Sequence, residues 1–207
     1  MLETHFHFLE DAGFTSLIQM ETNSRYGQNK SEVFLLNPGH PEATEYAPFY
    51  AGYIAKAQAV TDPLAALETQ LGETLAFLKP LTAAQQSHRY AEGKWSIKQV
   101  LNHLSDAERV FSYRAMRIAR NDKTPLPSFD EKAYVVAAEA DRLEWSTLLS
   151  EFESVRQSTL RLLRNSPEAA WTRLGVASGN PISVRALVLI MYGHVAHHLG
   201  IVRERYL

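Results

Sequence analysis

The sequence feature that most constrains the fold is a helical spacing of apolar residues that recurs in four long segments. After Asp62 and Pro63, leucines recur at intervals of 3, 4, 4 and 3 residues, which places them on one face of a helix. Asp62 is a typical N-cap, and Pro63 suits the first helical position. Pro80 disfavours helical geometry in the residue before it. The pattern therefore predicts a helix that ends by Lys79.

Three further segments have the same periodicity and predict three more long helices, over about 97–120, 145–164 and 184–205. Ser96 and Ser183 are N-cap candidates for the first and last of these. The connectors between them are expected to hold short helices or turns at 81–93, 131–140 and 166–171, and an irregular or hairpin-like crossing at 172–181. Four amphipathic helices that each bury one face predict an all-α fold, a four-helix bundle with short extra helices.

The first 45 residues of the chain do not show the helical periodicity of the later segments. Residues 1–45 lack a sustained periodicity and contain the breakers Pro38, Gly39 and Pro41. A short strand is expected from Ser31 to Leu36. We therefore expect an N-terminal extension over residues 1–45, followed by the bundle domain over residues 46–207.

Composition excludes several classes of protein. The formal net charge of −2 gives no basic surplus for binding nucleic acid. The absence of cysteine leaves histidine and carboxylate as the available metal ligands. The N-terminus has no signal-peptide pattern, and the longest strongly apolar run, Ala186 to Tyr192, is too short to span a bilayer. We expect a soluble cytoplasmic protein that binds neither nucleic acid nor membrane.

Histidines in two of the expected helices form a candidate metal site. His194 and His198 are four residues apart, so both rings lie on one helix face and can reach one ion. His103 shares a face with Val100 and Ala107, so it can point into the same interior as a third ligand. The alternative is a set of buried histidines that hydrogen-bond to backbone carbonyls. The zinc-protease motif is absent because Val195 follows His194.

Four arginines also occupy the helix expected over 97–120. They are Arg109, Arg114, Arg117 and Arg120. We interpret them as a solvated helix face, and the alternative is an anion-binding site.

Three segments of the chain resemble the signature regions of the DinB-like superfamily. They are residues 93–97, 103–109 and 193–200, and their order and spacing agree with that family. Residues 46–50 and 129–131 resemble a subfamily, so the resemblance covers roughly residues 46–207.

The resemblance implies a DinB-like four-helix bundle that forms a homodimer and holds one divalent metal ion, zinc or nickel. The ligands would be His103, His194 and His198. Three neutral imidazoles leave coordination positions open, as in a catalytic site. Some family members resemble enzymes that transfer a thiol, and others have been described only as metal-dependent hydrolases. We therefore predict a thiol S-transferase that takes a small-molecule thiol and an electrophile. The alternatives are a hydrolase that uses metal-bound water, or a non-catalytic metal-binding stress protein.

Four other side chains are candidates for roles at this site. Asp106 follows His103 by three positions and is the candidate catalytic residue, to orient a ligand ring or accept a proton. The alternative interpretation of Asp106 is a solvent-exposed carboxylate on the helix surface. The candidate substrate-binding residues are Tyr50, Tyr113 and Tyr134. The alternative is that these tyrosines are half-buried residues near loops with no role in binding.

Overall fold

The computed structural model describes residues 38–207. The strand expected at 31–36 and most of the N-terminal extension expected over 1–45 lie outside the described residues. The extension therefore stays a prediction.

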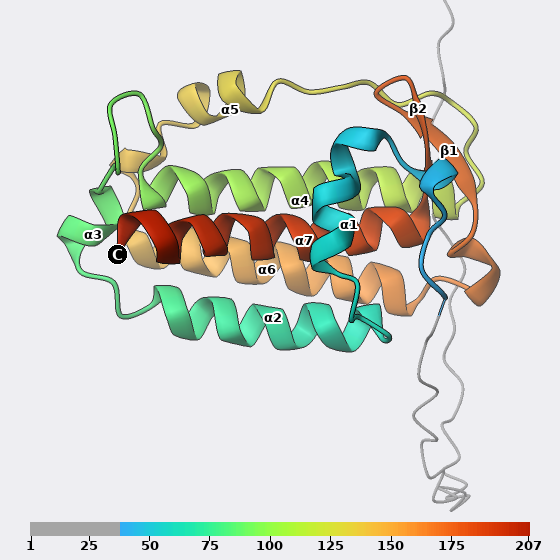
Figure 1. The fold of residues 1–207 in the computed structure, drawn as a ribbon, viewed down its shortest axis with the longest axis horizontal. Helices are drawn as coiled ribbons and strands as arrows, with labels where there is room; N and C mark the ends of the chain where they lie inside the picture. Colours follow the sequence, from blue (N-terminus) through green and yellow to red (C-terminus); the bar gives the residue numbers. More distant parts are fainter. Residues whose placement is uncertain (1–37) are drawn as a thin grey trace, which may run out of the picture. The chain divides into compact units, whose positions relative to one another are not determined.

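Four long helices form the bundle, and they match the four periodic segments of the sequence. They are α2 (Pro63–Leu78), α4 (Ile97–Ala119), α6 (Trp145–Arg164) and α7 (Val184–Ile201), which run side by side (Figure 1). A π-helical turn, Val202–Tyr206, continues α7. The predicted all-α four-helix bundle is confirmed.

Side-chain caps fix where three of these helices begin. Asp62 Oδ1 accepts hydrogen bonds of 3.0 Å from the amide nitrogens two and three residues later. Ser96 and Gln99 form a reciprocal capping box, with bonds of 3.0 and 3.1 Å. Ser183 Oγ accepts a bond of 3.1 Å from the amide of Ala186. The predicted N-caps of α2, α4 and α7 are all confirmed.

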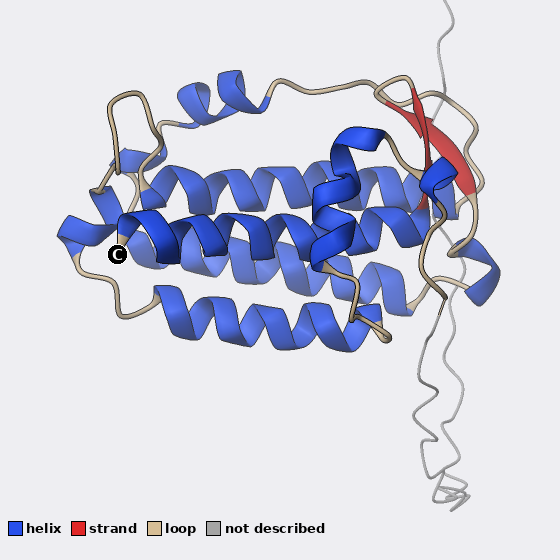
Figure 2. Cartoon of the chain, in the orientation of Figure 1, coloured by secondary structure: helices blue, strands red, loops and turns tan. Residues whose placement is uncertain are grey.

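The connectors contain short elements. The helical ones are η1 (Ala43–Glu45), η2 (Pro48–Tyr50), α1 (Ala51–Lys56), α3 (Ala83–Ser87), α5 (Glu131–Ala138), η3 (Ala140–Arg142) and η4 (Glu168–Ala170). The crossing before α7 is an antiparallel hairpin of β1 (Leu174–Ala177) and β2 (Asn180–Ser183), with Leu174 opposite Ser183 (Figure 2). Helix α1 was not predicted, because six residues are too few to display a helical period.

Helix α7 supplies much of the hydrophobic core. Together with its π-helical turn, the segment Val184–Tyr206 is long and apolar enough to cross a membrane by length and composition alone. However, 61% of its most apolar window is buried inside the protein. Its hydropathy is therefore accounted for by its position as a core helix.

A buried polar network joins all four long helices. Arg156 of α6 donates to both carboxylate oxygens of Glu108 of α4, at 2.7 and 2.8 Å. The same guanidinium donates to the Leu67 carbonyl oxygen and to Gln70 Oε1 of α2, at 3.0 and 3.1 Å. Gln70 in turn donates to the Tyr192 carbonyl oxygen of α7 at 2.9 Å. The side chains of Arg156 and Glu108 are only 0% and 3% exposed, so both charges depend on these partners.

A second ion pair attaches the segment before α1 to α7, and it makes stability depend on pH. Arg185 Nε donates to Glu45 Oε2 at 2.9 Å. This hydrogen bond to Arg185 is the main cause that lowers the pKa of Glu45 from 4.5 to about 2. The ionised carboxylate therefore stabilises the fold above about pH 4.5, and this stabilisation is lost as the pH falls towards 2.

We expect Glu45→Gln to lower the free energy of unfolding by about 2 kcal/mol at pH 7 and by less than half of that at about pH 3. Denaturant titration at both pH values measures the difference. The control is Glu68→Gln, which removes an exposed ion pair with Arg164 and should cost less than about 0.5 kcal/mol. Equal destabilisation by Glu45→Gln at both pH values would contradict this assignment.

Candidate metal centre

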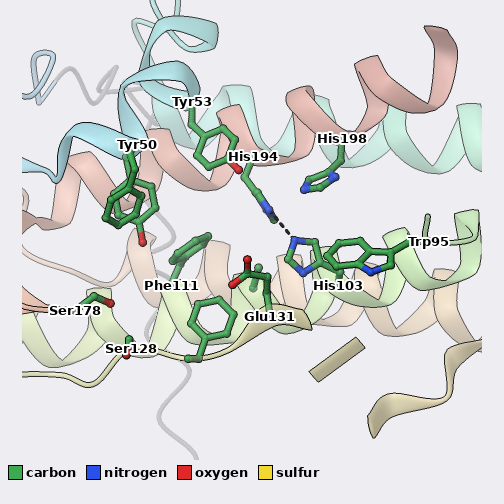
Figure 3. Close-up of a pocket in the computed structure, with 13 residues that line it drawn as sticks. Tyr50, Tyr53, Trp95, His103, Phe111, Ser128, Glu131, Ser178, His194 and His198 are labelled. Atoms are coloured by element: carbon green, nitrogen blue, oxygen red, sulfur yellow. Dashed lines mark hydrogen bonds between the residues drawn. The ribbon is translucent and has the colours of Figure 1, made fainter. Parts of the chain in front are cut away.

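The structure brings the three candidate histidine ligands together from two helices. His103 comes from α4, and His194 and His198 project from the same face of α7 (Figure 3). One ring nitrogen from each residue lies within 4.8 Å of the others. His103 Nε2 and His194 Nε2 are 3.0 Å apart.

The spacing of these nitrogens fits a divalent ion. Nitrogen ligands at about 2.0–2.1 Å from a tetrahedral ion are about 3.3 Å apart. One observed separation is 3.0 Å and none of the three exceeds 4.8 Å, which is compatible with that value. Within residues 38–207, the cluster consists of these three histidines alone, which corresponds to an open site and not to a closed structural one.

Burial keeps the three imidazoles neutral. It lowers the pKa of His103 to about 4 and that of His198 to about 3. It also lowers the pKa of His194 far below its ordinary value, since this side chain is almost fully enclosed. The neutral ring is the form that binds metal, so the cluster is ready to accept an ion at neutral pH without first releasing protons.

Aromatic side chains surround the histidine rings. Trp95 packs on His103 and stacks over His198, with ring centroids 4.9 and 6.5 Å away. Tyr53 and Phe111 make edge contacts with His194, at 5.3 and 5.9 Å. These contacts restrict the orientation of the rings.

Gly193 allows helix α1 to lie against the metal centre. A Cβ atom at this position would be 2.0 Å from the Tyr53 carbonyl oxygen of α1, closer than any real contact. Residues larger than glycine would therefore push α1 away from α7, together with the Tyr53 ring that contacts His194.

We expect Gly193→Ala to lower the free energy of unfolding by about 1–3 kcal/mol, because overpacking forces the backbone to shift. Gly200→Ala is the matched control on the same helix, because a Cβ atom there meets nothing within 4 Å. This control should be neutral or stabilising by up to about 1 kcal/mol. Thermal unfolding measures both, and a Gly193→Ala protein as stable as the wild type would show that α1 does not pack as described.

The histidines open into a cavity of about 510 Å³. Its aromatic walls are Phe49, Tyr50, Tyr53, Trp95, Phe111 and Phe129. Its other polar side chains are Ser128, Glu131 and Ser178 (Figure 3). The site therefore combines an apolar interior with a few polar groups, as small-molecule sites do.

Not all predicted site residues reach this cavity. Tyr50 lines it, but Tyr113 and Tyr134 line a neighbouring groove, which shares Ser128 and Phe129 with the cavity, and are each 47% exposed. Asp106 is not among the cavity residues either. Its carboxylate lies 3.3 Å from Arg109, which also binds Glu151 of α6 at 2.7 Å. Asp106 therefore belongs to an ion-pair network with α6.

Glu131 is the cavity carboxylate that the sequence analysis did not single out. It is the first residue of α5, whose N-cap Asp130 accepts bonds of 3.0 Å from the amides of Lys132 and Ala133. The charge of Glu131 acts on His103, whose pKa it raises against the larger effect of burial. In the sequence, the one signal for Glu131 was its position in the region 129–131, which resembles a DinB-like subfamily.

The fold and the histidine cluster define a helical bundle with an open three-histidine centre. The family model described as DinB superfamily matches residues 66–202, which is more than half of the chain. The chain belongs to the DinB superfamily.

Two relatives are provisionally named metal-dependent hydrolases. One, from Oceanobacillus iheyensis, is 27% identical over 133 residues, which cover 63% of this chain and 74% of the relative. The other, from Geobacillus thermodenitrificans, is 30% identical over 149 residues, or 69% of this chain and 82% of the relative.

A solved structure has a similar fold. YfiT from Bacillus subtilis, provisionally described as a metal-dependent hydrolase with an unusual four-helix bundle topology, superimposes with a TM-score of 0.62. The match covers 82% of this chain and 94% of YfiT at 18% sequence identity, so the likeness concerns the fold.

Proposed function

We propose that this protein is a metal-dependent hydrolase of small acyl substrates, with zinc or nickel held by His103, His194 and His198. The observation that carries the proposal is the convergence of three neutral imidazoles and the carboxylate of Glu131 on one cavity. The names of the two relatives support the same reaction class. When bound, a divalent ion supplies a Lewis acid that polarises a carbonyl and acidifies water.

The side chains of this chain would serve the remaining steps. Glu131 accepts a proton from the attacking water as the water oxygen bonds to the acyl carbon. The bond from that carbon to the leaving group then breaks, and the same proton passes to the leaving group. The aromatic walls exclude bulk water and strengthen the electrostatic interactions inside the cavity.

A second candidate is the thiol S-transferase that we predicted from the sequence. The cavity of about 510 Å³ supports it, because this volume accommodates a small thiol beside an electrophile. In this reaction Glu131 takes the thiol proton, a sulfur–carbon bond forms, and the leaving group departs with the electron pair of its bond.

One pair of assays tests both candidates. Zinc- and nickel-loaded protein is given a panel of aryl esters and amides without thiol, and separately an alkyl halide electrophile with and without a small thiol. Metal-dependent release of phenol or amine without thiol supports the hydrolase, and turnover that requires thiol supports the transferase. Activity that survives complete chelation of the metal would overturn both.

We expect Glu131→Gln to lower kcat by about 10²–10⁴-fold without loss of metal, because the amide cannot accept the proton. The matched comparison is Asp106→Asn, at the carboxylate that points towards α6. Steady-state kinetics with elemental analysis of both variants separates the two residues. A large loss in Asp106→Asn with little change in Glu131→Gln would reverse their roles.

A further inference from the structure

Arg114 of α4 is a buried cation without an acidic partner in the described part of the chain. It is 2% exposed, and no carboxylate of residues 38–207 lies within 4.0 Å of its guanidinium. Its hydrogen bonds go to the Pro127 carbonyl oxygen at 2.6 Å and to Ser178 Oγ at 3.1 Å, which are both neutral. The prediction that the arginines of this helix form a solvated face is therefore wrong for Arg114.

The other fully buried arginine of residues 38–207 does have an acidic partner. Arg156 has the bidentate carboxylate of Glu108 as its partner. An uncompensated buried charge is strongly unfavourable, so such groups are normally paired with an opposite charge from the protein or from a ligand.

Arg114 itself lines a neighbouring groove that shares Ser128 and Phe129 with the cavity that contains the histidines, so its positive charge lies beside one end of that cavity. Its partner Ser178 lines this cavity, and so does Tyr50, whose pKa the nearby positive charge of Arg114 lowers against the larger effect of burial. Figure 3 shows Tyr50, Ser128 and Ser178 at one end of the cavity, and Trp95 and His198 at the other. The electropositive end therefore lies apart from the metal centre, but both belong to one cavity, so one ligand can contact both.

The hydroxyl groups at this end can donate to an anion. Ser178 Oγ accepts a hydrogen bond from Arg114, so its own proton is available. Burial raises the pKa of Tyr50 above its ordinary value, and Arg114 offsets only part of this effect. The Tyr50 hydroxyl therefore keeps its proton at neutral pH.

We propose that Arg114, through Tyr50 and Ser178, forms a recognition site for the carboxylate of the substrate, so that this enzyme acts on small carboxylate-bearing molecules. The single charge of one guanidinium matches a monoanion, and Glu131 in the same cavity disfavours a group of higher negative charge. This proposal rests on the proposed function in one respect, which is that the reacting bond of the same molecule lies at the three histidines.

Calorimetric titration tests this site without any turnover. The probes are ω-phenyl carboxylates with three to six carbons in the acid chain, each paired with its neutral primary amide. They are titrated into metal-free and zinc-loaded full-length protein. We expect at least one carboxylate to bind about tenfold or more tightly than its amide in both forms. Because the metal-free protein is included, this titration can be interpreted even if the three histidines do not bind a metal ion.

Variants assign the preference to the proposed groups. Arg114→Met should abolish the preference for the carboxylate, and Tyr50→Phe should reduce it several-fold while it leaves the shape of the wall unchanged. Tyr50→Phe keeps the test valid where Arg114→Met does not fold, as judged by circular dichroism. Arg161→Met removes an exposed positive charge of α6 and should leave the preference intact.

Four results would overturn the proposal. The first is equal affinity for every carboxylate and its amide, and the second is no binding of any probe up to millimolar concentration. The third is a preference that persists in both Arg114→Met and Tyr50→Phe. The fourth is a preference that exists only in the zinc-loaded protein, which would assign the carboxylate to the metal.

Discussion

Replacement of Arg156 by methionine is expected to lower the free energy of unfolding by about 3–5 kcal/mol, because it leaves the buried carboxylate of Glu108 without its partner. The loss also frees the Leu67 carbonyl and Gln70, through which the network reaches α2. Chemical denaturation monitored by circular dichroism measures the change.

A double replacement separates the ion pair from simple packing. Removing both charges in Arg156→Met with Glu108→Leu should cost less than either single change, because no unpaired charge then remains. Destabilisation that is additive over the two sites would contradict the view that these charges depend on each other.

The His194→Ala variant is expected to lose at least about 10³-fold in hydrolytic activity, since a bound metal ion contributes several kcal/mol of transition-state stabilisation. His194 is one of the three histidines of the cluster, so its loss leaves only two ligands. The variant should remain folded, because the helices of the bundle are held by other contacts.

His197→Ala is the matched control for His194→Ala on the same helix. The His197 ring contacts Tyr53 and His198, at 5.5 and 5.1 Å, but it is not part of the three-histidine cluster. This variant should keep its metal and most of its activity. Equal loss of metal in both variants would mean that the ligand set is assigned incorrectly.

Periodicity and capping chemistry made the framework predictable. The leucine spacing after Asp62 and the caps Ser96 and Ser183 gave three of the four helix starts, because these signals are local in the chain. The pairing of His103 with the α7 histidines was also predictable, since each shares the apolar face of its helix.

The rest of the site depends on contacts that no local pattern encodes. Glu131 follows a loop that contains two prolines, and α1 approaches α7 only because residue 193 is glycine. Arg114 carries the same charge as its exposed neighbours on α4, yet the loop and the hairpin enclose it. Asp106 is the opposite case, because it is close to His103 in the sequence but does not line the cavity.

The central claim is that His103, His194 and His198 bind one divalent ion. The most direct measurement is anomalous X-ray diffraction from crystals of untagged protein loaded with zinc or nickel. We expect one anomalous peak per chain within about 2.0–2.1 Å of a nitrogen from each of the three rings. Loaded crystals with no peak among these rings, or with a peak that persists after His103 and His194 are both replaced by alanine, would contradict it.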